Sequence, residues 1–136
     1  MAQVVIDLCV MQPKLLPLLL TLIMEKCPYT IPKYIEHVPG QTEKEYKACL
    51  GYIVDSSSNI EGEQSYFERM TGIISLYGAI VQTLPTIGAK NPYGIENSWI
   101  WLSTILNIKP QDITPYLICS FLDVSWDFIT RTSNFL

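Results

Sequence analysis

The strongest hydrophobic pattern in the chain covers residues 63–84, where apolar side chains recur at spacings of three and four residues. Such spacing places them on one face of an α-helix. The positions that define this face are Tyr66, Met70, Ile73, Tyr77, Ile80 and Leu84. We therefore expect residues 63–84 to form the central and most buried helix. Gly72 and Gly78 lie inside it, and because each glycine costs a helix about 1 kcal/mol, they predict close contact with a neighbouring helix.

Prolines divide the rest of the chain into further helical segments. Proline occupies positions 13, 28, 85, 92 and 110. A proline favours the first turn of a helix and ends one elsewhere. The apolar periodicity between these prolines predicts helices near residues 14–26, 92–107 and 112–131. Asp112 is expected to cap the last of them.

Two shorter segments also have helical signals. Residues 3–11 are apolar with a single charge, which predicts a buried helix. Thr42 is followed three residues later by Glu45, the pattern of a capping box, so a short helix is expected from there to Gly51. No segment shows the alternation of a strand. The fold class is therefore all-α, either a helical solenoid of the armadillo or HEAT type or an irregular bundle.

Both ends of the chain carry apolar residues where a solenoid usually has a polar cap. These residues are Val4, Val5, Ile6, Leu8 and Val10 near the start, and Trp126, Phe128, Ile129, Phe135 and Leu136 near the end. We expect exposed apolar surface at one or both ends, with a tendency to self-associate or to require a partner.

The charge balance argues against a nucleic-acid partner. The formal net charge is −4 and the isoelectric point is about 4.8, whereas nucleic-acid-binding domains are usually basic. Hydrophobic residues make up 49% of the chain. The longest apolar run, residues 15–24, is nevertheless about half as long as the roughly 20 residues that cross a bilayer. We predict no direct contact with nucleic acid and no membrane span.

The chain has few residues that could perform catalysis. His37 is its one histidine and lies in a proline-rich loop, so a triad or Cys-His site would have to use it. No P-loop, G-x-S-x-G or zinc-protease motif is present. The spacings of Cys9, Cys27, Cys49 and Cys119 fit neither a zinc site nor a small disulfide scaffold, and we expect buried free thiols. The prediction is that the protein is not an enzyme, with no catalytic residue and no metal site.

Three cations leave a structural and a functional interpretation open. Arg69 either pairs with Glu68, Glu63 or a neighbouring helix, or is exposed for a partner or a phosphate. Lys26 either complements the carbonyl groups at the end of its helix or joins Lys33 in a site for a polyanion. The segment between the two lysines begins with a Cys-Pro corner.

Several stretches, in this order and spacing, resemble the GLE family of nuclear-pore mRNA-export mediators. The resemblance runs from about residue 10 to about residue 125. The stretches are residues 26–29 (KCPY) with 31–32 (IP), residues 46–52 (YKACLGY), residues 66–77 (YFERMTGIISLY), residues 91–94 (NPYG) leading to 98–99 (SW), and residues 102–107 (LSTILN).

The resemblance implies a fold and a set of partners. It implies HEAT-like helical hairpins, here forming an incomplete solenoid, with residues 1–136 a partial C-terminal helical domain truncated at both ends. Family members act at the cytoplasmic face of the nuclear pore, in nucleus and cytoplasm. They bind inositol hexakisphosphate and stimulate the export DEAD-box RNA helicase, which promotes poly(A)+ mRNA export. An FG-nucleoporin and translation initiation and termination factors are further implied partners.

The chain departs from the family at the expected inositol phosphate site. The family draws on several basic residues around the Cys-Pro corner, whereas here Lys26 matches and Lys33 is a neighbour on the adjoining loop. Glu25 stands where some relatives carry a second basic residue. We therefore expect weak binding of inositol hexakisphosphate by the chain alone. The alternative function is a structural interaction module that anchors pore or translation-factor partners without regulating an ATPase.

Overall fold

A computed structural model describes residues 2–86 and 90–133, with side chains as far as residue 126. Its elements are α1 (Ala2–Met11), α2 (Leu15–Lys26), the short 3₁₀-helix η1 (Pro28–Thr30), α3 (Glu43–Leu50), α4 (Glu63–Gln82), α5 (Ile95–Asn107) and α6 (Thr114–Ser133). Over these ranges the fold is all-helical, which confirms the predicted fold class. The single extended pairing is an isolated antiparallel bridge between Val54 and Ile60 in the loop after α3.

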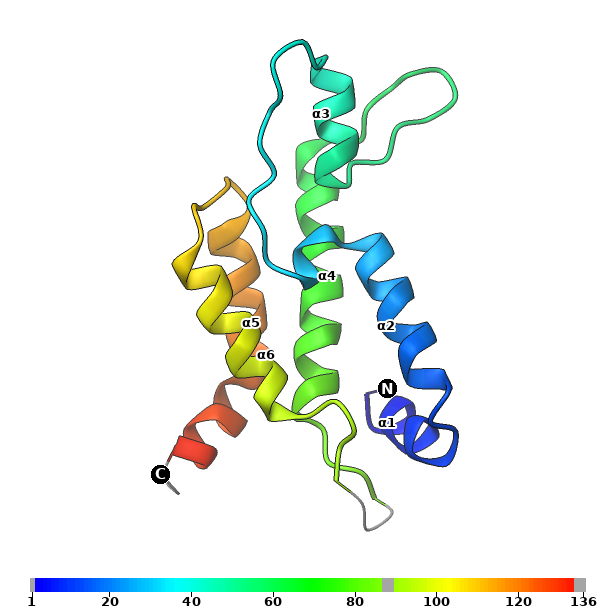
Figure 1. The fold of residues 1–136 in the computed structure, drawn as a ribbon, viewed down its shortest axis with the longest axis vertical. Coiled ribbons are helices and arrows are strands. Elements are labelled where there is room, and N and C mark those ends of the chain that lie inside the picture. Colours follow the sequence, from blue (N-terminus) through cyan, green and yellow to red (C-terminus); the bar gives the residue numbers. More distant parts are fainter. Residues whose placement is uncertain (1, 87–89, 134–136) are drawn as a thin grey trace.

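Helix α4 is the axis of the molecule. Figure 1 shows α4 upright in the middle, with α1 and α2 on one side, α5 and α6 on the other, and α3 beside its N-terminal end. The most extensive packing of α4 is against α6, with smaller contacts to α1 and α5. The prediction of a central buried helix at residues 63–84 is therefore confirmed. Its closest partner is distant in sequence, rather than the neighbouring helix of a hairpin.

Two apolar clusters hold these helices together. In the larger cluster, Trp101 of α5 and Phe121 of α6 stack with their ring centroids 4.3 Å apart, and both are buried. The indole nitrogen of Trp101 donates a hydrogen bond to the backbone oxygen of Tyr29 at 3.0 Å, which attaches η1 to the same core. The smaller cluster joins Ile6 of α1 and Ile23 of α2 to Ile80 of α4. Both sides of α4 are thus anchored by buried side chains.

Hydrogen bonds near the helix starts, rather than the positions of the prolines, determine where the helices begin. Thr42 and Glu45 form the predicted capping box, and Gly51 ends α3 in the left-handed conformation with φ of 95°. Helix α5, however, begins at Ile95 rather than at residue 92. The side chain of Asn91 explains the difference: its amide nitrogen donates to the backbone oxygens of Ile80 and Thr83, at 2.8 and 2.7 Å. These bonds tie the start of the segment to the end of α4 and keep it outside the helix.

The last helix also starts later than predicted. Helix α6 begins at Thr114, whose hydroxyl accepts a hydrogen bond from the backbone nitrogen of Gln111 at 2.9 Å. The prediction that Asp112 caps this helix is wrong: Asp112 is exposed in the turn before it, and Thr114 makes the hydrogen bond there. The threonine hydroxyl stabilises this turn in its place.

The two glycines of α4 differ in what surrounds them. A Cβ atom added to Gly78 would lie 2.8 Å from Cγ2 of Val124 and 3.2 Å from the ring of Phe121, so close contact with α6 requires glycine here. A Cβ atom at Gly72 would meet nothing within 4 Å. The prediction of close helix contact is therefore confirmed at Gly78 and wrong at Gly72, which is on the exposed side of the helix.

The apolar N-terminal segment is only partly exposed. Ile6 is fully buried, whereas Val4 and Leu8 are 60% and 46% exposed. On α2, Leu18 is 69% exposed. Trp126 is 58% exposed at the other end, and the side chains of residues 128, 129, 135 and 136 lie outside the described part of the chain. The expectation of exposed apolar surface is thus met at residues 4, 8 and 126.

The contrast between Gly78 and Gly72 can be measured directly. Alanine at either position gains about 1 kcal/mol of helix propensity over glycine. At residue 78 the added methyl group must displace Val124, and such overpacking typically costs about 1–3 kcal/mol. In urea denaturation we expect Gly72→Ala to raise the free energy of unfolding. The free energy of unfolding of the Gly78→Ala variant should be about 1–3 kcal/mol lower than that of the Gly72→Ala variant. Equal effects of the two substitutions would contradict the α4–α6 contact.

Candidate functional site

The two predicted site lysines lie on either side of the Cys-Pro corner. Lys26 ends α2, and Lys33 is on the loop after η1; both are exposed. Between them Cys27 and Tyr29 are buried, and the backbone nitrogen of Cys27 donates to Ile23 at 2.9 Å. The corner is therefore anchored in the core, whereas its two lysines are exposed. Within residues 2–86 and 90–126 neither lysine forms a salt bridge.

Arg69 belongs to the framework rather than to an exposed site. Its guanidinium lies 2.6 Å from the carboxylate of Glu61 and donates to the backbone oxygen of Gly51 at 2.8 Å. The hydrogen bond from Arg69 holds the pKa of the Glu61 carboxyl below its usual value, although partial burial opposes the shift. The structural interpretation is confirmed, with Glu61 as partner instead of Glu63 or Glu68. The bond fastens the loop after α3 to the start of α4.

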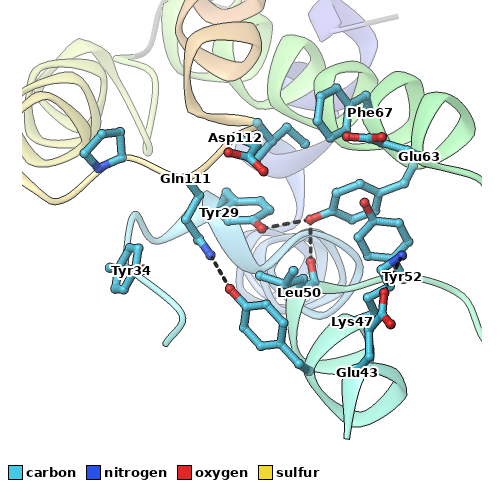
Figure 2. A pocket seen from close by; sticks show the side chains of 14 residues that line it. Tyr29, Tyr34, Glu43, Lys47, Leu50, Tyr52, Glu63, Phe67, Gln111 and Asp112 are labelled. Atoms are coloured by element: carbon cyan, nitrogen blue, oxygen red, sulfur yellow. Dashed lines mark hydrogen bonds and ion pairs between the residues drawn. The ribbon is translucent and has the colours of Figure 1, made fainter. Parts of the chain in front are cut away.

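A cavity of about 460 Å³ opens where α3, η1, the start of α4 and the α5–α6 link meet. Five of the eight tyrosines of the chain line it: Tyr29, Tyr34, Tyr46, Tyr52 and Tyr66. Figure 2 shows Glu63 and Asp112 on one side of the cavity and Glu43 with Lys47 on the other. Phe67 and Leu50 complete the apolar part of the wall.

A chain of hydroxyl groups forms the floor of this cavity. The hydroxyl of Tyr66 donates to the backbone oxygen of Leu50 at 2.7 Å. Its single proton is used there, so the hydroxyl of Tyr29, 2.8 Å away, must be the donor between the two tyrosines. Burial raises the pKa of Tyr29 to about 12, against a smaller opposing effect of the bond with Tyr66. Burial, and then the bond with Tyr29, raise the pKa of Tyr66 above its usual range. Both groups are neutral at physiological pH.

Gln111 joins the two walls of the cavity. Its side-chain nitrogen donates to the backbone oxygen of Ile35 at 3.0 Å, and the hydroxyl of Tyr46 donates to the same oxygen at 3.1 Å. The side-chain nitrogen of Gln111, which is labelled in Figure 2, also donates to the hydroxyl of Tyr46 on α3 at 3.4 Å. These bonds fix a loop, a short helix and a turn that are far apart in the sequence.

Stacked rings form the side of the cavity nearest α4. The rings of Tyr52 and Tyr66 lie 3.7 Å apart and nearly parallel, at 12°. The amino group of Lys47 lies 5.3 Å from the centre of the Tyr52 ring and 3.5 Å from the carboxylate of Glu43. The cavity lining therefore combines aromatic rings, several carboxylates and the amino group of Lys47, which pairs with Glu43.

Sequence reasoning did not find this cavity. The signal was the concentration of tyrosines in residues 29–66, but their spacing follows no helical or strand period. His37, the one candidate base, packs its ring against Tyr46 with centroids 5.0 Å apart and lies outside the cavity lining. All four cysteines are free, as predicted, but the expected burial is confirmed only at Cys9 and Cys27 and is wrong at Cys49 and Cys119, which are exposed. In the part of the chain that the structure describes, no group of three metal-ligating side chains comes together.

Comparison with known proteins decides the family. Residues 1–130 match the family model described as GLE1-like protein. The chain belongs to the GLE1-like family. This confirms the resemblance inferred from the ordered motifs between residues 26 and 107.

Relatives are found in animals and plants. The mRNA export factor GLE1 of Rattus norvegicus is 36% identical over 118 residues, which cover 84% of this chain and 17% of the relative. The Drosophila melanogaster factor is 27% identical, with coverage of 96% and 20%, and the Arabidopsis thaliana factor is 33% identical, with coverage of 83% and 16%. The chain thus spans about a fifth or less of the length of these relatives.

Solved structures of the family share the fold. A structure described as the S. cerevisiae Dbp5 C-terminal domain bound to Gle1 and IP6 matches with a TM-score of 0.78 and 25% identity, over 91% of this chain and 43% of that chain. A second structure, with a variant of Gle1 in the same complex, matches with a TM-score of 0.76. Of the helices described here, none combines the length and apolar character needed to cross a bilayer.

The buried tyrosines predict loss of stability in alkali. The pKa of Tyr29 is about 12 in the folded protein and about 10 in the unfolded chain. Because the unfolded chain loses its tyrosine protons first, the stabilisation is complete below pH 10 and is lost as the pH rises from about 10 toward 12. Urea denaturation across this range should show the fall. Tyr29→Phe should reduce this pH dependence. Indistinguishable pH profiles for the unsubstituted protein and this variant would contradict the buried relay.

Proposed function

We propose that this chain is a non-enzymatic mRNA export factor of the cytoplasmic face of the nuclear pore. In this proposal it binds the export DEAD-box RNA helicase, with inositol hexakisphosphate as a tether, and stimulates the helicase's ATPase so that poly(A)+ mRNA export proceeds. The observation that carries the proposal is the match, at a TM-score of 0.78, to a structure containing Dbp5, Gle1 and IP6. We also propose that residues 1–136 are part of a longer helical domain, since the match covers 43% of the solved chain.

The lysine corner is the proposed contact for inositol hexakisphosphate. Lys26 and Lys33 are exposed, and neither is neutralised by a carboxylate within the described side chains. Two lysines next to Glu25, on a chain of net charge −4, would hold a polyanion weakly. The tether therefore needs further cations from the helicase. Binding of inositol hexakisphosphate should be weak for the chain alone and stronger when the helicase is also present.

The alternative is an interaction module that anchors pore proteins, an FG-nucleoporin among them, or translation initiation and termination factors without regulating an ATPase. The exposed apolar side chains on α1 and α2 favour this alternative, because such patches often mark protein contacts. They include Val4, Met11 and Leu18, which are 60%, 64% and 69% exposed. Both proposals predict binding, but they differ in whether the helicase turns over faster.

An ATPase assay separates the two proposals. The helicase is assayed with RNA, with and without this chain, and with and without inositol hexakisphosphate. We expect the chain to raise the ATPase rate and inositol hexakisphosphate to raise it further. The double substitution Lys26→Ala with Lys33→Ala should remove the part of the ATPase stimulation that depends on inositol hexakisphosphate. Lys14→Ala, at the opposite end of α2, is the matched control for Lys26→Ala alone and should retain the full stimulation. Binding without any change in rate would favour the anchoring module.

A further inference from the structure

The tyrosine-lined cavity continues into a second, more open hollow along α4. The second hollow shares Glu63 and Phe67 with the cavity and extends past Glu68 and Thr71 to Tyr116 of α6. The rings of Phe67 and Tyr116 lie 5.0 Å apart and form its wall. The two hollows adjoin at Glu63 and Phe67, and together we call them the α4 groove. A groove of this form suits an extended chain better than a compact small molecule.

The α4 groove carries unbalanced negative charge. Glu63 and Asp112 line it, and no lysine or arginine among residues 2–86 and 90–126 pairs with either. Lys47 belongs to the described lining and pairs with Glu43 on the far side, and Lys109 lies over the ring of Tyr34 at the edge of the cavity, so neither lysine neutralises Glu63 or Asp112. Burial and then the charges of Glu63, Glu61 and Asp112 raise the pKa of Tyr52, so the negative potential reaches this ring. A ligand that enters the groove meets two carboxylates beside aromatic faces.

The aromatic faces at this end of the molecule already hold cations. The amino group of Lys47 lies over the ring of Tyr52 at 5.3 Å, and that of Lys109 lies over the ring of Tyr34 at 4.5 Å. A cation over an aromatic face is attracted by the ring quadrupole, and the attraction grows where water is excluded. Both rings belong to the cavity lining. These contacts show that rings at this end of the molecule can hold a cation, and because both are occupied, a ligand would use another ring of the lining, such as Phe67.

We propose that the α4 groove binds an arginine-bearing segment of a partner protein. A planar guanidinium can make paired hydrogen bonds to a carboxylate such as Glu63 or Asp112 and stack on a ring such as Phe67 at the same time. A lysine offers only a point charge for these contacts. A metal ion is disfavoured, because the described side chains bring no three metal-ligating groups together. The groove shares Tyr29 with the segment between the two lysines, but its carboxylates give it the opposite charge, so it provides a second binding site.

Peptide binding tests the proposal. The probe is a short fluorescent glycine–arginine peptide, and its counterpart carries citrulline, which keeps the shape of arginine and lacks the charge. Titration by fluorescence anisotropy at near-physiological salt, where non-specific charge effects are screened, gives both affinities. We expect the arginine peptide to bind at least about tenfold more tightly than the citrulline peptide. Equal affinities, or no binding of the arginine peptide, would overturn the proposal.

Two double variants, each of which removes two carboxylates, test where the peptide binds. Glu63→Gln with Asp112→Asn removes the two groove carboxylates, and we expect it to weaken arginine-peptide binding by at least about tenfold. Glu25→Gln with Asp123→Asn removes the same two charges from exposed positions on α2 and α6, and should change the affinity by less than about twofold. All four positions are solvent-exposed, and circular dichroism checks that both variants are folded. Equal losses in the two variants would show attraction to overall negative charge and overturn the assignment to the α4 groove.

Discussion

Gly78 allows helices α4 and α6 to approach because its missing side chain leaves room for Val124 and Phe121. This contact sets the position of α6, and through the stack of Phe121 on Trp101 it also sets α5. Trp101 then holds the backbone of Tyr29, which places η1 against the core. One close approach between helices distant in sequence therefore orients the elements that build the candidate site.

The two proposed binding regions depend on this frame in different ways. The lysine corner follows from a local feature, the end of α2 at Lys26 and the buried Cys27 and Tyr29 that come after it. The α4 groove needs the whole frame, because its walls come from α3, η1, α4 and the α5–α6 link. Tyr66 connects the regions: its hydroxyl contacts both Tyr29 and Leu50, at 2.8 and 2.7 Å. The two proposed regions are thus linked through the hydrogen bonds of one buried tyrosine.

The local features of the fold could be predicted from the sequence, and the tertiary ones could not. The capping box at Thr42 and the central helix follow from nearest-neighbour spacing, so sequence pattern suffices for them. The spacing also gave Gly72 and Gly78 the same expected role, but whether a glycine meets another helix depends on which face that helix covers. Helix α5 starts later than predicted because Asn91 forms hydrogen bonds to backbone atoms 8 and 11 residues earlier. The spacing of apolar residues gives no information about such bonds.

The candidate site shows the same division. The family motifs led to the lysines at the corner, since those motifs are contiguous stretches of sequence. The partner of Arg69 was not predictable, because Glu61 lies in a loop whose path depends on α3 and α4 together. The tyrosine-lined cavity draws on segments between residues 29 and 113, and its tyrosines share no period. A site made by assembly of distant segments leaves only a compositional trace in the sequence.

The central proposal is that this GLE1-like chain binds an export DEAD-box RNA helicase. Calorimetric titration of the chain with the C-terminal domain of its DEAD-box helicase, with and without inositol hexakisphosphate, tests it most directly. The account predicts saturable one-to-one binding that is tighter when inositol hexakisphosphate is present. A folded chain that gives no binding heat and no complex under either condition would contradict it.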